Sequence, residues 1–194
     1  ALAGNVNGPS LVRAPPWVER PLGRYYLYFA HHQGDRIRLA TADALPGPWR
    51  LHAPGVLPVA DSTCFHHVAS PDVHLDADRG EVRLYFHGPT KGVRPEAEGL
   101  ADLFEVTGVQ RTKLATSRDG LRFGAHREIL GAAYFRVFPH GGFHYALAMP
   151  GLLYRSRDGR SAFEKGPTLF GRGMRHAALC LRGVAFVCRW PHLP

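Results

Sequence analysis

The sequence repeats one pattern of short apolar segments, and this repeat restricts the possible folds more than any other feature. In each copy an aromatic and β-branched run passes through a turn into a second apolar run, and an aromatic residue closes the unit. The leading runs are Tyr25–Ala30, Val82–His87 and Phe143–Ala148, and the closing aromatic residues are Trp49, Phe123 and Phe163. Runs of this kind, separated by turn residues, are typical of antiparallel strands. We expect each closing aromatic side chain to wedge between neighbouring sheets.

A further apolar segment precedes each copy, which gives four strands per unit. Asp119-Gly120 and Asp158-Gly159 stand where a hairpin needs a positive backbone φ. No segment shows a helical period with caps, except that a short helix could begin at Pro95. Four-stranded units repeated about an axis form a propeller. The sequence therefore predicts an all-β fold, a β-propeller of four-stranded antiparallel blades, with a β-sandwich or a solenoid as the alternative.

The repeat also sets the expected blade boundaries. Three blades cover about residues 5–52, 66–124 and 132–170, and a fourth begins at about 174 and stops near 190. About three and a half blades cannot close a ring of five. We therefore expect a single propeller domain over residues 1–194 that is truncated at its C-terminus and able to self-associate through an open blade edge.

Composition excludes several classes of partner. Of the 194 residues, 45% are hydrophobic. No apolar run approaches the ~20 residues that cross a bilayer, so no membrane partner is expected. The net charge is +8, but the arginines are scattered, which favours a solvated surface over a nucleic-acid partner and leaves acidic or phosphorylated sugars open. Cys64, Cys180 and Cys188 lack the spacing of a metal site, and we expect neither a metal nor a cofactor.

Polar residues gather at one end of the channel that a propeller encloses. The first strand of each blade lines the channel, and its start lies beside the end of the antiparallel second strand. This rule brings one carboxylate, Asp72, toward residues that could bind a substrate. They are Asn7, His31, His32, His87, Tyr134, Arg136, Arg175 and His176. We expect Asp72 to be catalytic, with a turn role as its alternative, and only one of the adjacent His31 and His32 to face the channel.

The segment from Gly88 to Gln110 leaves the same end of the channel and is longer than its counterparts. It carries four carboxylates, Glu96, Glu98, Asp102 and Glu105. Long loops in compact folds are usually functional or disordered. This segment could therefore bring a second carboxylate to Asp72.

Two motifs and their order resemble glycoside hydrolase family 43 and its relatives, which are five-bladed propellers. Gly8-Pro9-Ser10 precedes the run Tyr25–Phe29, and Ser70-Pro71-Asp72 precedes the run Leu84–Phe86. The resemblance covers the chain from Asn5 to about Val187. It implies a carbohydrate partner and glycosidase activity.

The resemblance also implies roles for three carboxylates, of which this sequence has one. In the family a base Asp precedes the Pro of the first blade, a second Asp after Ala-Pro tunes the acid, and a Glu at the start of the third blade donates the proton. Asp72 matches the second of these, whereas Gly8 stands at the base position and residues 131–136 contain no Glu.

Glycoside hydrolysis generally needs two carboxylates. The missing acid could come from the Gly88–Gln110 segment, or His32, His87 or His176 could act as the acid or base. The expected function is that of a glycoside hydrolase-like propeller acting on a carbohydrate in the channel. The alternative is a propeller that binds a glycan or a protein without catalysis.

Overall fold

The computed structural model describes residues 6–32, 34–90, 109–170 and 177, and its strands form antiparallel sheets. The first sheet contains β1 (Asn7–Arg13), β2 (Tyr25–Ala30), β3 (Arg36–Ala42) and β4 (Arg50–Pro58). The second contains β5 (Ala69–Asp76), β6 (Glu81–Pro89), β7 (Gln110–Ser117) and β8 (Gly124–Ala125), with β9 (Gly131–Ala132) also paired to β7. The third contains β10 (Arg136–His140), β11 (Phe143–Ala148), β12 (Leu152–Ser156) and β13 (Glu164–Thr168).

Helical structure in the described ranges is limited to the 3₁₀ turn η1 (Val59–Asp61). No helix there could span a membrane. The short helix expected from Pro95 falls outside the described residues. The prediction of an all-β fold is confirmed.

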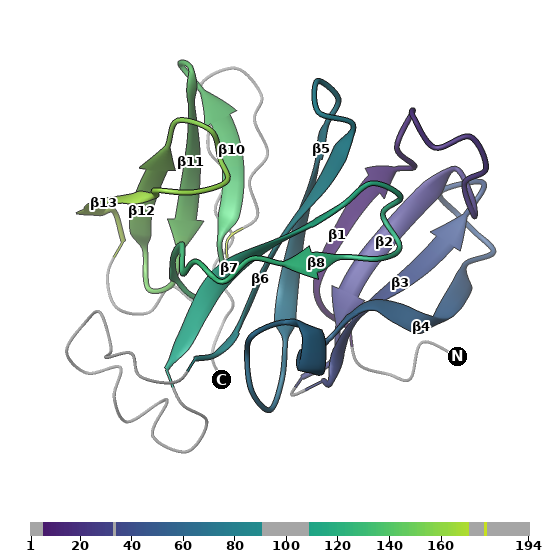
Figure 1. Ribbon diagram of the computed structural model, residues 1–194, viewed down its shortest axis with the longest axis horizontal. Helices are drawn as coiled ribbons and strands as arrows, with labels where there is room; N and C mark the ends of the chain where they lie inside the picture. Colours follow the sequence, from purple (N-terminus) through teal and green to yellow (C-terminus); the bar gives the residue numbers. More distant parts are fainter. Residues whose placement is uncertain (1–5, 33, 91–108, 171–176, 178–194) are drawn as a thin grey trace.

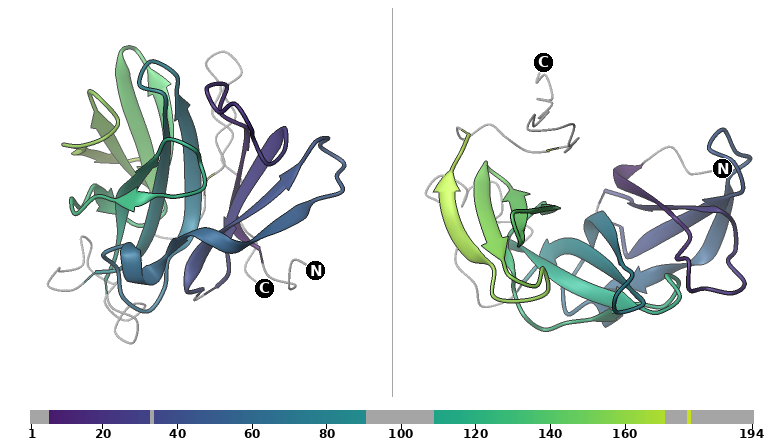
Figure 2. Two further views of the ribbon diagram at one scale, coloured as in Figure 1. Left: turned by 45° about the vertical axis from the view of Figure 1, so that its right-hand side comes forward. Right: turned by 90° about the horizontal axis from the view of Figure 1, so that it is seen from above.

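The sheets stand side by side, each strand following its predecessor within the sheet (Figure 1). Seen from above, they form an arc and not a closed ring within the described part (Figure 2). The first strand of one sheet lies against the first strand of the next, as β1 does against β5. This is the arrangement of propeller blades, here an incomplete ring.

Each pair of neighbouring sheets encloses a core. The first core lies between the first and second sheets and includes Tyr26, Tyr28, Leu84 and Phe86. The second core lies between the second and third sheets and includes Tyr85, Leu114, Phe135 and Tyr154. Alternate residues of β6 serve the two cores because successive side chains of a strand point to opposite faces. Both faces of the second sheet are buried at β6. This explains why the sequence of β6 is a nearly continuous apolar run.

We call the contacts between the first and second sheets the first joint, and those between the second and third sheets the second joint. A tyrosine on the second strand of a blade secures each one. The Tyr28 hydroxyl donates to the Gly120 carbonyl over 2.8 Å at the first joint. At the second joint, the Tyr85 hydroxyl donates to the Gly159 carbonyl. Both acceptors belong to the Asp-Gly turns that the repeat contains.

A polar side chain on the first strand of a blade forms the other recurring contact. Ser10 Oγ accepts a hydrogen bond from the backbone N–H of Val73, over 2.9 Å. At the second joint, Asp72 Oδ2 accepts from the backbone N–H of Val137, over 2.8 Å. Ser10 and Asp72 both follow the proline of their repeat, so they occupy equivalent positions.

Candidate functional site

The starts of β1, β5 and the segment before β10 share an unusual backbone. Gly8, Ser70 and Tyr134 occupy equivalent repeat positions and have φ values of 52°, 47° and 68°. For a residue other than glycine, such a conformation costs roughly 1–3 kcal/mol and is often found at functional sites. The pairing register also shifts beside Gly8 and Ser70, as it does at a β-bulge that redirects a side chain.

Asn7 links two of these strand starts. Its buried side chain accepts a hydrogen bond at Oδ1 from Ser70 Oγ over 2.6 Å. Its Nδ2 lies 3.1 Å from His32 Nε2 and donates to that nitrogen when the nitrogen carries no proton. His31 is directed elsewhere, since its Nδ1 lies 3.0 Å from the backbone oxygen of His32. The structure therefore brings Asn7, His32 and Ser70 together and leaves His31 outside this cluster.

Two further predicted residues lie in ring contact. The centroids of the His87 and Tyr134 rings are 4.0 Å apart, and the ring planes are tilted by 42°. His87 is buried on β6, whereas Tyr134 is half-buried. Arg136 follows closely, and its Nη1 donates to the carbonyls of Ser70 and Pro71, each over 3.3 Å. The guanidinium group thus supports the strained start of β5.

Asp72 is a residue of β5, and its side chain extends to β10. The side chain is 14% exposed. Its Oδ2 accepts from the Val137 amide and lies 3.0 Å from His74 Nε2. Burial raises the pKa of Asp72, but the His74 hydrogen bond and charge, the Arg136 charge and the Val137 amide lower it more. The pKa of Asp72 therefore lies below its ordinary value, and the carboxylate is ionised at neutral pH. These contacts give Asp72 a structural task at the second joint, and a catalytic role for it stays a prediction.

The position that corresponds to the family's base has no room for a side chain. A Cβ added at Gly8 would lie 2.5 Å from the Ser70 Cα. The inner strands of the first two blades approach so closely here that a carboxylate cannot be accommodated. Arg175, His176 and the four carboxylates of the segment Gly88–Gln110 lie outside the described residues.

A buried lysine that the sequence did not predict lies near this end of the molecule. Lys113, on β7, is 3% exposed, and its Nζ donates to Thr63 Oγ1 over 2.9 Å. Thr63 and His66 have positive φ values of 62° and 66° in the segment between β4 and β5. Nearby, burial raises the pKa of the Cys64 thiol. A lysine inside a strand carries no sequence signal of such burial, because the covering segment approaches only in the folded chain.

Metal-binding geometry is not found in the described part of the chain. No group of three or more His, Cys, Asp or Glu side chains there could hold an ion. The functional groups at the strand starts are an amide, imidazoles, a phenol ring and a guanidinium group. Such groups can bind a polar ligand and, through the imidazoles, move a proton.

Comparison with known proteins gives one curated relative. No protein-family model matches the chain. The uncharacterized protein R118 of Acanthamoeba polyphaga mimivirus is 32% identical over 185 residues, which cover 86% of this chain and 48% of that protein. The chain thus spans about half the length of this relative.

Solved structures define the class of fold. The family 43 arabinoxylan arabinofuranohydrolase of Bacillus subtilis matches with a TM-score of 0.57 and 18% identity, covering 81% of this chain and 35% of the enzyme. An α-L-arabinofuranosidase of Clostridium thermocellum matches with a TM-score of 0.57 and 16% identity, covering 82% and 50%. A β-xylosidase/α-arabinofuranosidase from a compost metagenome matches with a TM-score of 0.52 and 17% identity, covering 73% and 42%.

The chain therefore has the β-propeller fold of glycoside hydrolases. Among these, its fold is similar to that of family 43, and at such low identity the similarity concerns the fold. The predicted resemblance to that family is confirmed at this level.

Proposed function

We propose that this chain forms part of a glycoside hydrolase-like propeller that binds a carbohydrate at the channel end of its first strands. The observation that carries the proposal is the cluster of Asn7, His32 and Ser70 beside the strained start of β5. Contacts between neighbouring blades keep Ser70 in its strained conformation, and they bring polar groups of these blades to one end. The similarity of the fold to glycoside hydrolases supports the choice of a carbohydrate as the ligand.

The chemistry of the cluster suits a sugar. A sugar hydroxyl both donates and accepts hydrogen bonds, and the amide of Asn7 and the imidazole of His32 offer both partners. The Tyr134 ring adds an aromatic surface, and ligand sites commonly combine such surfaces with a few fixed polar groups. The compost enzyme was solved with xylotriose and the Bacillus subtilis enzyme with cellotetraose, so these oligosaccharides are suitable first probes.

Hydrolysis forms the second part of the proposal. Cleavage needs a proton donor and a base or nucleophile. Asp72 provides an ionised carboxylate whose Oδ2 already serves the Val137 amide and His74. A proton would then be moved by His32, by His87, or by a carboxylate from the segment Gly88–Gln110. The alternative is a propeller that binds a glycan without cleaving it.

Binding is tested by calorimetric titration of the whole chain with xylotriose and cellotetraose. We expect saturable binding of at least one of them, weakened about tenfold in a His32→Ala variant, because a hydrogen-bonding partner of the sugar is lost. His52→Ala is the matched control, since His52 lies on the outer strand β4. Absence of saturable binding, or an equal loss in both variants, would contradict the proposal.

Catalysis is tested separately with a panel of aryl glycosides. Release of the aryl alcohol by the wild type, reduced in His32→Ala or His87→Ala, would support hydrolysis. Saturable binding without release from any member of the panel would favour the glycan-binding alternative.

A further inference from the structure

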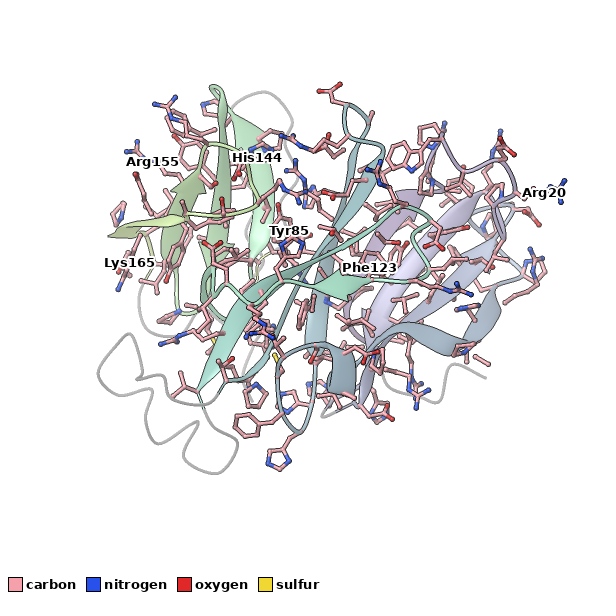
Figure 3. All side chains as sticks on the ribbon, in the orientation of Figure 1. Arg20, Tyr85, Phe123, His144, Arg155 and Lys165 are labelled. Atoms are coloured by element: carbon pink, nitrogen blue, oxygen red, sulfur yellow. The ribbon has the colours of Figure 1, made fainter. Side chains whose placement is uncertain are left out.

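A hollow lies at the second joint, away from the strand starts. It is a cavity of about 480 Å³ where β5 ends and β6 begins. Its lining includes His74, Arg83, Tyr85, His144, Arg157 and Asp158. Tyr85 and His144 belong to neighbouring sheets (Figure 3). The volume falls within the roughly 300–1,000 Å³ of small-molecule sites.

The first joint is filled at the equivalent place. There Trp17 packs against the first core, and its indole N–H donates to the Arg118 carbonyl over 2.8 Å. Arg118 and Arg157 each precede an Asp-Gly turn, so they are equivalent in the repeat. At the second joint the loop of residues 77–80 contains no aromatic residue. The cavity therefore occupies the place that Trp17 fills at the first joint.

The lining of this cavity is polar where the first joint is apolar. By the repeat, His74 stands in the place of Val12, and Arg83 in the place of Tyr26. Val12 and Tyr26 both contribute to the first core. The Arg83 side chain is only 6% exposed, although it carries a charge. A cavity with a polar lining takes up polar molecules, whereas an apolar one can stay dry.

Two buried nitrogen atoms at this cavity lack a hydrogen-bond partner within the described residues. They are Nδ1 of His144 and Nε of Arg83. Burial and the Arg83 charge lower the pKa of His144, so its ring is neutral at pH 7, and it hydrogen-bonds to the Arg157 backbone. A neutral ring that donates from one nitrogen can only accept at the other. His144 Nδ1 thus needs a donor, whereas Arg83 Nε–H needs an acceptor.

The cavity is lined by as many arginines (Arg79, Arg83 and Arg157) as aspartates (Asp76, Asp78 and Asp158). Arg83 Nη2 pairs with Asp76 Oδ2. The Asp158 carboxylate accepts from the backbone N–H groups of Arg160 and Ser161, over 2.8 and 3.1 Å, and the pKa of Asp158 is lowered to about 2, with burial opposing those hydrogen bonds. A ligand therefore needs no net charge.

We propose that this cavity is a second binding site, for a neutral polyhydroxyl molecule of about the size of a monosaccharide. A hydroxyl group both donates and accepts hydrogen bonds, so it suits a lining in which imidazole rings and guanidinium groups stand side by side. The His144 ring and Arg83 Nη1 both lie within 2.8 Å of the point where Gly159 would carry a Cβ, which places the two residues beside each other. This site does not depend on the channel end.

The test uses the whole chain carrying His32→Ala, so that binding at the channel end is weakened. Calorimetric titration with D-xylose, L-arabinose and D-glucose should show saturable binding of at least one sugar. Adding His144→Phe, which keeps the ring shape but removes the acceptor, should weaken it about tenfold or more. His144→Asn, which returns an acceptor close to the ring, should restore part of the affinity.

Three results would overturn this proposal. They are no saturable binding of any of these sugars, equal affinity with and without His144→Phe, and tighter binding of inorganic phosphate than of every sugar. Melting temperatures of both variants show whether the fold is intact. Should His144→Phe fail to fold, His144→Leu, which also removes the acceptor, takes its place, and a sugar affinity equal to that of the chain with His144 would count against the site.

Discussion

At the first joint the space between the sheets is filled by apolar side chains, with Trp17 at one end. At the second joint the same space is lined by His74, Arg83 and His144 and includes a cavity of about 480 Å³. Both joints nevertheless have the same two kinds of contact, a tyrosine hydroxyl to a turn carbonyl and a polar side chain to a backbone amide. The recurring contacts hold neighbouring blades together, whatever fills the space between them.

This difference indicates where polar side chains and a cavity replace apolar packing between two sheets. Burying polar groups costs free energy unless they are hydrogen-bonded, and the second joint contains several of them. Sequences that depart from locally consistent packing often do so at functional sites. The second joint, which also contains Asp72, therefore has polar side chains between its sheets where the first joint has apolar ones.

The largest effect should come from truncating the first core. Leu84 is fully buried there, and Leu114 is fully buried in the second core. We expect Leu84→Ala to lower the free energy of unfolding by about 3–4 kcal/mol and Leu114→Ala by less, since the cost depends on how far the surroundings can collapse. Urea unfolding measures both. A larger loss for Leu114→Ala would contradict the contrast between the joints.

The polar contacts of the two joints should differ in strength. Asp72→Ala removes a buried ionised acceptor and leaves His74 and the Val137 amide without it. We expect a loss of about 2–3 kcal/mol, against about 1 kcal/mol for Ser10→Ala, because hydrogen bonds to charged groups are stronger. Chemical denaturation of both variants gives the comparison. Equal losses would mean that the charge of Asp72 adds nothing to the second joint.

The tyrosine contacts should be equivalent. Tyr28→Phe and Tyr85→Phe each remove one buried hydrogen bond to a turn carbonyl and keep the ring. Both should cost about 1 kcal/mol of unfolding free energy. A difference beyond about 1 kcal/mol would show that this shared contact is not equivalent at the two joints.

The smallest effect concerns pH and the second joint alone. The lowered pKa of His144 means that the folded state resists protonation, while the unfolded ring takes up a proton near pH 6.5. Stability should therefore fall as the pH drops below about 6.5 toward the lower pKa of the folded state. The charges of Arg83, His74 and Asp158 act on this ring, and Asp76, Asp78, Arg79 and Arg157 also line the cavity. Thermal melts between pH 7 and 5 should show a shallower decline in His144→Phe, and identical declines would contradict this account.

The repeat contained enough information to predict the sheets. Alternating apolar segments and Asp-Gly turns define strands locally, so strand pairing followed from the order of the segments. Two closing aromatic residues act as expected, since Phe123 lies in the first core and Phe163 packs against the second. Trp49 differs, because its indole N–H donates to the Leu45 carbonyl within the segment that joins β3 to β4, and Trp49 is absent from these cores.

The site was harder to predict because it depends on contacts between blades. The rule for strand starts placed Asn7 at one end of the channel, but it could not show that Asn7 accepts a hydrogen bond from Ser70. Arg136 was expected to face Asp72, yet it donates to the carbonyls of Ser70 and Pro71 and acts on Asp72 only through its charge. The joints bring such groups together through tertiary packing, which the local sequence does not encode.

The most direct test of the central claim is a map of carbohydrate-induced changes in the backbone amide NMR spectrum. Xylotriose is titrated into the isotopically labelled whole chain. We expect saturable shifts at Asn7, His32, Ser70 and Tyr134, with little change on the outer strand β4. Shifts confined to other surfaces, or no saturable shift with xylotriose or cellotetraose, would contradict a carbohydrate site at the channel end.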